Sequence, residues 1–264
     1  MRQAFLSNAR RAMGDASLQS ALDRNAEGRQ RARREAWAGL HDVEDLRQHA
    51  RAIRQVTLDR LDSYLGLFVQ RLRERGVQVH QAGTAEEACQ IVVDIAQRRG
   101  AAQVAKSKSM LTEEIGLNAA LQKAGIQAVE TDLGEYIVQL RHEHPSHILT
   151  PALHLSRQAV AETFRSELGL QVTPEVSDLT RAARKSLRDV FLSAPIGVSG
   201  VNFGVAETGT LCLVTNEGNG RMVTSLPPVH IALMGIERLV PTLSDLRVML
   251  QLLPRSGTGQ KLSS

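Results

Sequence analysis

Residues 101–131 read "AAQVAKSKSMLTEEIGLNAALQKAGIQAVET", and the order of elements in this stretch decides the fold class. The runs at 101–107 and 125–131 are short and largely apolar, as buried strands are, and a helical pattern at 112–124 separates them. Thr112 followed by Glu113 and Glu114 is typical of a helix start. A strand, a helix and a second strand at this spacing predict a βαβ unit, and therefore a parallel sheet.

The same alternation of strands and helices continues in both directions along the chain. It predicts further strands at 77–82 and 146–152, and helices at 84–99, 155–168 and 174–192. Beyond residue 192 the pattern changes to strand-like runs at 197–206, 210–216, 221–226 and 230–236, followed by a helix at 243–253. Glycine-rich turns between the first three of these runs favour antiparallel hairpins. The expected fold is α/β, with a mostly parallel sheet flanked by helices and an antiparallel hairpin portion.

A helical N-terminal arm precedes this fold. Apolar residues recur every three or four positions before Gly76, which has the position of a helix end. They are Leu58, Leu61, Leu65, Phe68 and Leu72. We therefore expect two parts, a helical arm at 1–76 and an α/β domain at 77–264.

The arm carries most of the positive charge. Residues 1–76 hold 15 Lys and Arg against 10 Asp and Glu, and the excess lies in the run Arg24–Glu35. Such a run can bind nucleic acid or an acidic partner, but only 3% of the residues are aromatic and no groove-reading motif is present. A solvated helix is the better interpretation, and no nucleic-acid partner is predicted.

Composition limits the class of protein. The chain has 264 residues, of which 42% are hydrophobic, and no apolar run is long enough to cross a membrane. The start also lacks the apolar core of a signal peptide, so we expect a cytoplasmic protein. Cys89 and Cys212 are too few for an iron–sulfur cluster, and His142, His144 and His147 lack the spacing of a zinc helix. No metal site is predicted.

The first candidate site is "KSKS" at 106–109, after a predicted strand. Ligands of open α/β sheets bind at the carboxyl ends of the strands. Lys106 and Lys108 point the same way along an extended chain, and Ser107 and Ser109 add hydroxyls. This favours a small anionic ligand. The alternative is a solvated turn.

The second candidate is "ETDLGEY" at 130–136, which follows the next predicted strand. Asp132 and Glu135 are expected near the same edge of the sheet. Helix capping by Asp132 explains the pattern equally well.

The third candidate is "GVAETGTLCLVTNEGNGR" at 204–221. Its uncharged run at 210–215 predicts a strand buried on both faces, with polar turns at each end that suit the floor of a pocket. Glu207 is the candidate nucleophile or base, unless Arg221 neutralises it structurally. The expected ligand-binding residues of the two turns are Thr208, Gly209, Asn216, Gly218, Asn219, Gly220 and Arg221. We expect these turns to meet the lysine loop across a shared cleft.

Several long motifs resemble the lactate-utilisation (LUD) domain family. They are "KSKSMLTEEIGLN", "ETDLGEYIVQL", "PSHILTPALH", "NFGVAETGTLCLVTNEGNGRMVTSLPPVHIALMGIERLVPTLSDL" and "LLPRSGTGQKLSS". The resemblance covers nearly the whole chain. It implies a cytoplasmic bacterial system in which three proteins together oxidise L-lactate to pyruvate. It also implies a fold similar to the ribose-phosphate isomerase and CoA-transferase superfamily, where a glutamate in a Glu-x-Gly turn, as at Glu207, accepts the acyl group.

Family members of this type continue into a ferredoxin-like region with C-x-x-C-x-x-C motifs, which this sequence does not contain. The expected function is therefore that of the α/β domain of an iron–sulfur subunit of a lactate-oxidising complex, which binds a small anionic ligand or a partner subunit. No cofactor is expected in this chain, and 4Fe–4S clusters are expected in a missing C-terminal region or in a partner. Either the chain is a trimmed domain or the gene is split.

Two alternatives remain open. One is a self-sufficient acyl or CoA transferase that uses Glu207. The other is a non-catalytic scaffold whose helical arm docks the other lactate-utilisation subunits.

Overall fold

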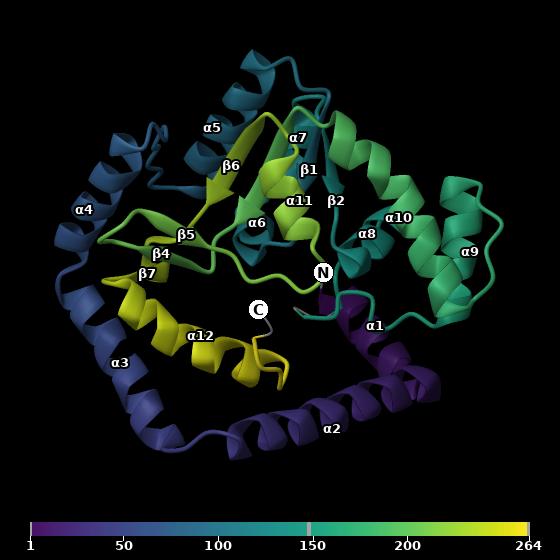
Figure 1. The fold of residues 1–264 in the computed structure, drawn as a ribbon. Coiled ribbons are helices and arrows are strands. Elements are labelled where there is room, and N and C mark those ends of the chain that lie inside the picture. Colours follow the sequence, from purple (N-terminus) through teal and green to yellow (C-terminus); the bar gives the residue numbers. More distant parts are fainter. Residues whose placement is uncertain (1, 147–148, 263–264) are drawn as a thin grey trace.

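The computed structural model describes residues 2–146 and 149–262. In this part of the chain a four-stranded parallel sheet has the order β2-β1-β3-β6 (Figure 1). Its strands are β1 (Gln103–Lys106), β2 (Gln127–Glu130), β3 (Ile196–Gly200) and β6 (Val229–Leu233). The central strand β3 is buried along most of its length, because helices cover both faces of the sheet.

Alternate residues of β1 identify the two faces, since successive side chains of a strand point to opposite sides. Val104 packs into a core with α5 (Ala85–Arg98) and α7 (Leu117–Lys123). Ala105 packs into another core with α8 (Leu133–Leu140), α10 (Val176–Ser193) and α11 (Asn219–Ser225). The short helix α6 (Met110–Glu114) follows β1, and α9 (Arg157–Leu168) packs against α8 and α10.

A second, smaller sheet lies beside the first. After β3 the chain enters β4 (Phe203–Val205), which forms an antiparallel hairpin with β5 (Thr210–Cys212) and pairs in parallel with β7 (Leu239–Val240). Helices α3 (Val43–Asp59), α4 (Leu61–Glu74) and α12 (Leu243–Gly257) cover it. The 3-10 turn Ile236–Arg238 leads into β7.

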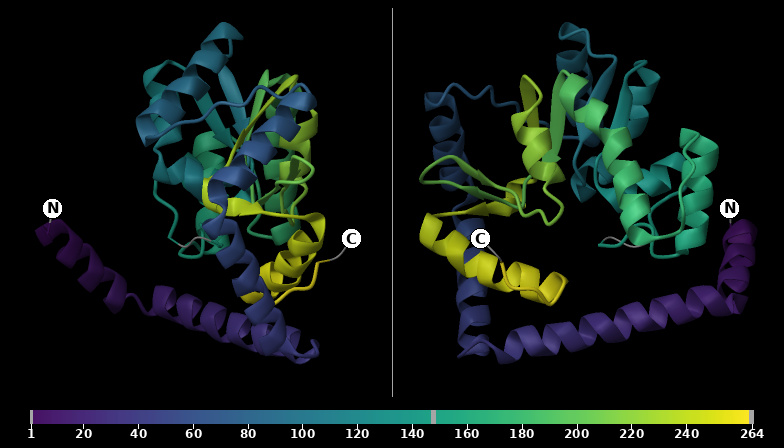
Figure 2. Two further views of the ribbon diagram at one scale, coloured as in Figure 1. Left: turned by 90° about the vertical axis from the view of Figure 1, so that its left-hand side faces the viewer. Right: turned by 45° about the vertical axis from the view of Figure 1, so that its right-hand side comes forward.

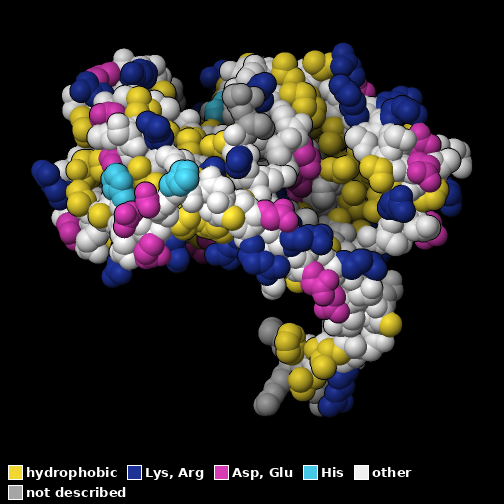
Figure 3. All heavy atoms as spheres, turned by 60° about the horizontal axis from the view of Figure 1, so that its bottom comes forward, with side chains coloured by type: hydrophobic (Ala, Val, Ile, Leu, Met, Phe, Trp, Pro, Cys, Tyr) yellow, Lys and Arg dark blue, Asp and Glu magenta, His cyan; other side chains and the backbone are white. Residues whose placement is uncertain are grey.

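The N-terminal arm consists of α1 (Arg2–Gly14) and α2 (Ala16–Ala38), and it projects from the body (Figure 2). Its second half is held by the end of α12. Arg29 Nη1 donates a hydrogen bond to the Gly257 carbonyl at 3.4 Å, and Gly259, with φ of +70°, lies so close to Ala32 that a Cβ would be 2.5 Å from the Ala32 carbonyl carbon. The described residues of α1 project away from the body, and Phe5 and Met13 are 70% and 76% exposed. Hydrophobic side chains gather near the end of the projecting arm (Figure 3).

The structure confirms the parallel α/β architecture, a helical N-terminal arm and most predicted helices. The division expected at residue 76 stays a prediction, and α3 and α4, which lie before it, pack on the second sheet. Thr84 caps α5 as expected, and the helices predicted at 155–168, 174–192 and 243–253 form as α9, α10 and α12. Gly76 closes α4 with φ of +78°. The strands predicted at 101–107 and 125–131 form β1 and β2. The strand predicted at 230–236 is confirmed as β6, which pairs in parallel with β3.

Other predictions were wrong. Residues 77–82 form no strand, and residues 221–225 lie in α11, where the preceding glycines start a helix. Of the strand expected at 146–152, residues 147–148, including His147, lie outside the described residues, and the others form turns and bends.

Two further differences concern where elements break. The helix expected at 112–124 is two helices, because Gly116 adopts φ of +70° between them, and Ser109, not Thr112, caps the first. The run at 197–206 divides into β3 and β4, which belong to different sheets. Strand β5 is not buried on both faces: Thr210 is exposed and its neighbours are half-buried, since the strand lies at the edge of the small sheet.

Within the described residues, no helix combines the length and the apolar character that crossing a membrane requires.

We expect Gly197→Ala to destabilise the protein by about 1–3 kcal/mol or more, because the added Cβ would be 2.0 Å from the backbone oxygen of Val223 in α11. Chemical denaturation measures the change. The control is Gly28→Ala in α2, where nothing lies within 4 Å and helix propensity predicts a gain of about 0.5–1 kcal/mol. Equal stability of Gly197→Ala and the wild type would contradict this close packing.

Candidate functional site

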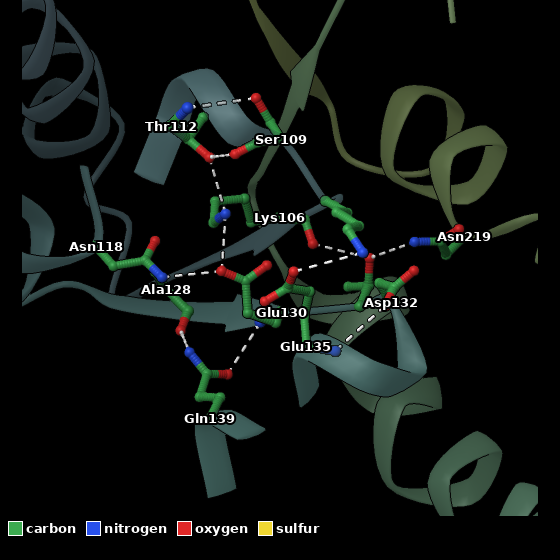
Figure 4. Close-up of polar contacts among 12 residues, drawn as sticks. Lys106, Ser109, Thr112, Asn118, Ala128, Glu130, Asp132, Glu135, Gln139 and Asn219 are labelled. Carbon is green, nitrogen blue, oxygen red and sulfur yellow. Dashed lines mark hydrogen bonds and ion pairs between the residues drawn. The ribbon is translucent and has the colours of Figure 1, made fainter. Parts of the chain in front are cut away.

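A buried ion pair joins the carboxyl ends of the two strands β1 and β2. Lys106 and Glu130 are the last residues of these strands and are partners in the strand register. Lys106 Nζ lies 2.7 Å from Glu130 Oε1, and the two side chains are only 1% and 5% exposed (Figure 4). Thr112 Oγ1 also accepts a hydrogen bond from Lys106 Nζ at 2.9 Å, and Asn118 Nδ2 donates to Glu130 Oε1 at 2.9 Å. Each charge is therefore compensated inside the protein.

The neighbouring helices are positioned by local hydrogen bonds. Ser109 caps α6 by accepting from the Thr112 N–H, which places Thr112 above the lysine. Gln139 of α8 binds the open edge of β2: its Nε2 donates to the Ala128 carbonyl at 2.9 Å and its Oε1 accepts from the Glu130 N–H at 3.0 Å. Since β2 is the last strand on this side, Gln139 satisfies backbone groups that a further strand would otherwise pair.

More carboxylates surround this pair. Asp132 caps α8 by accepting from the Gly134 and Glu135 N–H groups, and Glu217 Oε2 accepts from the Leu133 N–H at 3.1 Å. Lys108 Nζ lies 3.7 Å from Glu135 Oε1. We use the name strand-end cluster for the charged residues Lys106, Lys108, Glu113, Glu130, Asp132, Glu135 and Glu217.

Burial and mutual repulsion shift the titration of the cluster. Burial, followed by the nearby charges of Glu113 and Glu130, raises the pKa of Glu135 from its ordinary value of 4.5 to about 7, and Lys108 acts in the opposite direction. Burial of the carboxyl also raises the pKa of Glu113. The pKa of Glu217 is raised by burial and then by Asp132. The cluster therefore holds one carboxyl group, that of Glu135, that can exchange a proton near neutral pH.

The two lysines of "KSKS" have different environments. Lys106 is buried against Glu130, so it joins two strands and does not reach the solvent. Lys108 is 22% exposed and makes a longer contact, so it is the lysine that an external anion can reach. Ser107 is buried, and its N–H donates to the Val198 carbonyl of β3 at 2.9 Å. Ser109 is also buried, as the cap of α6.

The loop before α11 contacts the segment that follows β2. Asn219 is buried, its Nδ2 lies 3.5 Å from Thr131 Oγ1, and its Oδ1 accepts from Thr215 Oγ1 at 3.1 Å. Gly218 has φ of +78°, and a Cβ on Gly220 would be 3.3 Å from Thr215. Asn216 and Arg221 are exposed, and the Arg221 carbonyl accepts from Thr224.

Glu207 lies elsewhere, because its hairpin belongs to the second sheet. Its Oε1 accepts from the Leu243 N–H at 2.7 Å at the start of α12, and Arg71 of α4 donates to its carbonyl at 3.2 Å. Gly209, with φ of +69°, also lies against Arg71, and Thr208 Oγ1 donates to Thr210 Oγ1. This turn lies beside α4 in Figures 1 and 2, apart from α8.

The cleft expected between Glu207 and Lys106 therefore does not form among the described residues. Hollows of about 420 and 460 Å³ lie along α4 and α12 instead, and neither Glu207 nor Lys106 lines them. The contacts of Glu207 are those of a side chain that stabilises a helix start. Its acyl-transfer role stays a prediction from resemblance.

Sequence reasoning missed Glu113, Glu130 and Glu217 as members of the site. Glu130 carried a usable signal, since a carboxylate at the end of a buried strand needs a cationic partner, and Lys106 ends the neighbouring predicted strand. Glu113 was interpreted only as a residue of a helix start. Glu217 gave no local signal, because its contact with α8 joins segments far apart in the sequence.

The cysteines do not fit an iron–sulfur cluster. Cys89 of α5 packs in the core beside the parallel sheet and donates to the Ile115 carbonyl, whereas Cys212 of β5 packs in the core beside α3 and α12. Burial raises the pKa of both thiols, which disfavours the thiolate. No group of three or more His, Cys, Asp or Glu in the described part of the chain has the arrangement of a metal site.

Comparison with known proteins identifies the family. The LUD domain matches residues 65–264, which include the whole strand-end cluster. The chain belongs to the LUD domain family. No solved structure matches it.

Relatives in this family carry the name "Lactate utilization protein B". The protein of that name from Macrococcus caseolyticus is 50% identical over 226 residues, which is 85% of this chain and 47% of the relative. That from Oceanobacillus iheyensis is 48% identical over 241 residues, 91% of this chain and 50% of the relative. The protein of that name from Bacillus thuringiensis is 47% identical over 225 residues, which is 85% of this chain and 48% of the relative. The LUD chain described here spans about half the length of these curated relatives.

Lys106→Met should destabilise the protein by about 3–5 kcal/mol, because Glu130 then remains as a buried charge without its cation. Adding Glu130→Gln to this variant should recover part of the loss. Chemical denaturation of the single and double variants measures both effects. Lys123→Met, at an exposed lysine of α7, is the control and should change stability by less than about 0.5 kcal/mol. A Lys106→Met variant as stable as this control would argue against the ion pair.

Stability should fall as pH rises, with Glu135 as a principal cause. Its pKa is raised on folding from 4.5 to about 7. The stability that this group contributes is therefore fully present below about pH 4.5 and is lost as pH rises through about 7. Solvent near Glu113 screens part of the interaction. We therefore expect the free energy of unfolding to fall by about 2 kcal/mol between these two pH values.

The side chain of Glu135→Gln cannot ionise. The stability of this variant relative to the wild type should therefore rise by about 2 kcal/mol between about pH 5 and 8. Denaturation curves at several pH values provide the test, with Glu114→Gln on the exposed surface of α6 as control. Parallel pH profiles for Glu135→Gln and the wild type would refute the assignment.

Proposed function

We propose that this chain is the α/β part of a bacterial, cytoplasmic protein that acts with partner subunits to oxidise L-lactate to pyruvate. The observation that carries the proposal is the identity of about half of the aligned residues to proteins named "Lactate utilization protein B", over 85–91% of this chain. The strand-end cluster lies inside the matched region. It offers the chemistry that a small hydroxy acid requires.

The proposed roles follow from the geometry. L-lactate carries one carboxylate, and Lys108 is the cation of the cluster that reaches the solvent. It also carries a hydroxyl, and Glu135, adjacent to Lys108 and with a pKa near 7, is suited to accept a proton from such a group. Lys106 and Glu130 would hold these groups in place without touching the ligand.

Electrons from the oxidation must leave by another part of the assembly, since the two cysteines of this chain do not fit a cluster. We place the 4Fe–4S clusters that the family resemblance implies in a further region of the protein or in a partner. The arm supports contact with partner subunits, because it leaves Phe5, Met13 and a series of arginines exposed. This contact is also what the scaffold alternative requires.

Removal of the gene from its host tests this function. In a strain without another L-lactate dehydrogenase, we expect loss of growth on L-lactate and normal growth on pyruvate, because only the step between them is blocked. The wild-type gene should restore growth. Lys108→Met should restore it poorly, whereas Lys123→Met, an exposed lysine of α7, should restore it fully. Undiminished growth of the deletion strain on L-lactate would exclude the proposal.

A further inference from the structure

The hollow of about 460 Å³ along α12 has an apolar floor. Leu243, Leu246 and Leu250 line it at intervals of three and four residues, so they lie on one side of the helix. Leu262, in the segment after α12, also lines it. Leu243 and Leu262 are each 48% exposed, although leucine side chains are stabilised by burial. A partner that covers the hollow therefore gains free energy by excluding water.

The rim of this hollow is basic. Arg247, Arg255 and Lys261 line it together with the leucines, and none of its described lining residues is acidic. Arg247 and Lys261 are exposed. Three cations around an apolar floor favour an occupant that carries carboxylates at the edge of an apolar surface.

Arg255 indicates that a hydrogen-bond acceptor is missing. Its Nη1 donates to the Gln251 carbonyl of its own helix at 2.7 Å, but its Nε is buried and has no hydrogen-bond partner among the described residues. An unpaired buried donor costs free energy, and a carboxylate is the acceptor that best fits the N–H groups of a guanidinium. Because Arg255 lines the hollow, a carboxylate of an occupant can bind its guanidinium.

Helix α2 extends the basic surface beyond the rim. It lies beside the end of α12, because Gly259 packs against Ala32 and Lys261 Nζ is 3.6 Å from the position that a Cβ on Gly39 would take (Figure 1). The run Arg24–Glu35 of α2 has five arginines against two glutamates. An acidic occupant of the hollow is thus attracted by the arm as well as by the rim.

A second copy of this chain does not meet these requirements. Its helix α1 exposes Phe5 and Met13, but it also carries Arg10 and Arg11, and none of its described residues is acidic. If α1 of another copy lay in the hollow, like charges would meet at the rim, which disfavours binding. The occupant therefore has to come from a different protein.

We propose that the hollow along α12 binds an amphipathic helix of a partner protein, with apolar side chains on one face and Asp or Glu beside them. From Leu243 to Arg255, α12 rises about 18 Å, which matches about three turns of such a helix. The apolar face packs on the leucines, one carboxylate binds Arg255, and others lie near Arg247 and Lys261. This interaction surface goes beyond the proposed function. It rests on that function only for identifying the partner as another lactate-utilisation subunit.

Site-specific photo-cross-linking of the full chain in its host tests the proposal. A benzophenone amino acid placed at Gln251, which lines the hollow, should form a link to the partner protein. Mass spectrometry of the linked peptides identifies the segment, and we expect it to have apolar residues at helical spacing with carboxylates beside them. The same probe placed at Leu192 of α10, which is 61% exposed, should not link to this segment.

Charge reversal tests the role of the rim. Arg247→Glu combined with Lys261→Glu should lower the yield of the cross-linked product about tenfold or more, because carboxylates then face carboxylates. Arg184→Glu combined with Lys185→Glu makes the same change of charge on the surface of α10 and should leave the yield unchanged. All four side chains are exposed, so both double variants should unfold at the same denaturant concentration as the wild type.

Three results would overturn the inference. They are the absence of a cross-linked protein at Gln251, a link to a second copy of this chain, and a yield that the Arg247 and Lys261 double variant does not lower. Failure of the proposed function is distinguishable, because it appears as growth of the deletion strain on L-lactate. An acidic helix linked at Gln251 would then still support the docking surface.

Discussion

The buried ion pair between Lys106 and Glu130 constrains the rest of the structure. Two opposite charges inside a protein are tolerated only when each has its partner in place. These two are the last residues of neighbouring parallel strands, so the strand register has to bring them together. A slip of one residue would turn Lys106 to the other face. Helices α6, α7 and α8 each supply a contact to the pair or to the strand that carries it, through Thr112, Asn118 and Gln139.

The pair also explains why the edge of the sheet has unusual electrostatics. Once Lys106 is bound to Glu130, Lys108 is the one remaining ammonium of the strand-end cluster for four further carboxyls. Polar residues at the ends of parallel strands are expected in α/β proteins, since ligands bind there. What distinguishes this edge is the sign of its charge. An excess of carboxyls favours the retention of protons, and Lys108 is the lysine of the cluster that still reaches the solvent.

Sequence reasoning recovered the elements with strong periodicity and clear ends. The βαβ order around "AAQVAKS" and "GIQAVET" sufficed for the parallel sheet, and Thr84 located α5. It failed where distant segments decide the outcome. Residues 221–226 have the composition of a strand, but 221–225 belong to α11, which packs against Gly197, where the missing side chain leaves room for Val223. The local pattern also placed Glu207 correctly in a turn. It did not show that the chain passes from β3 into a second sheet, and this passage is what separates the turn from Lys106.

The contact between the arm and the end of α12 has a consequence for how the chain is made. Helix α2 is anchored by Gly257 and Gly259, which lie more than two hundred positions later in the chain. On the ribosome, the arm emerges well before the segment on which it docks. The arm of the nascent chain therefore remains unanchored until Gly257 and Gly259 have been translated.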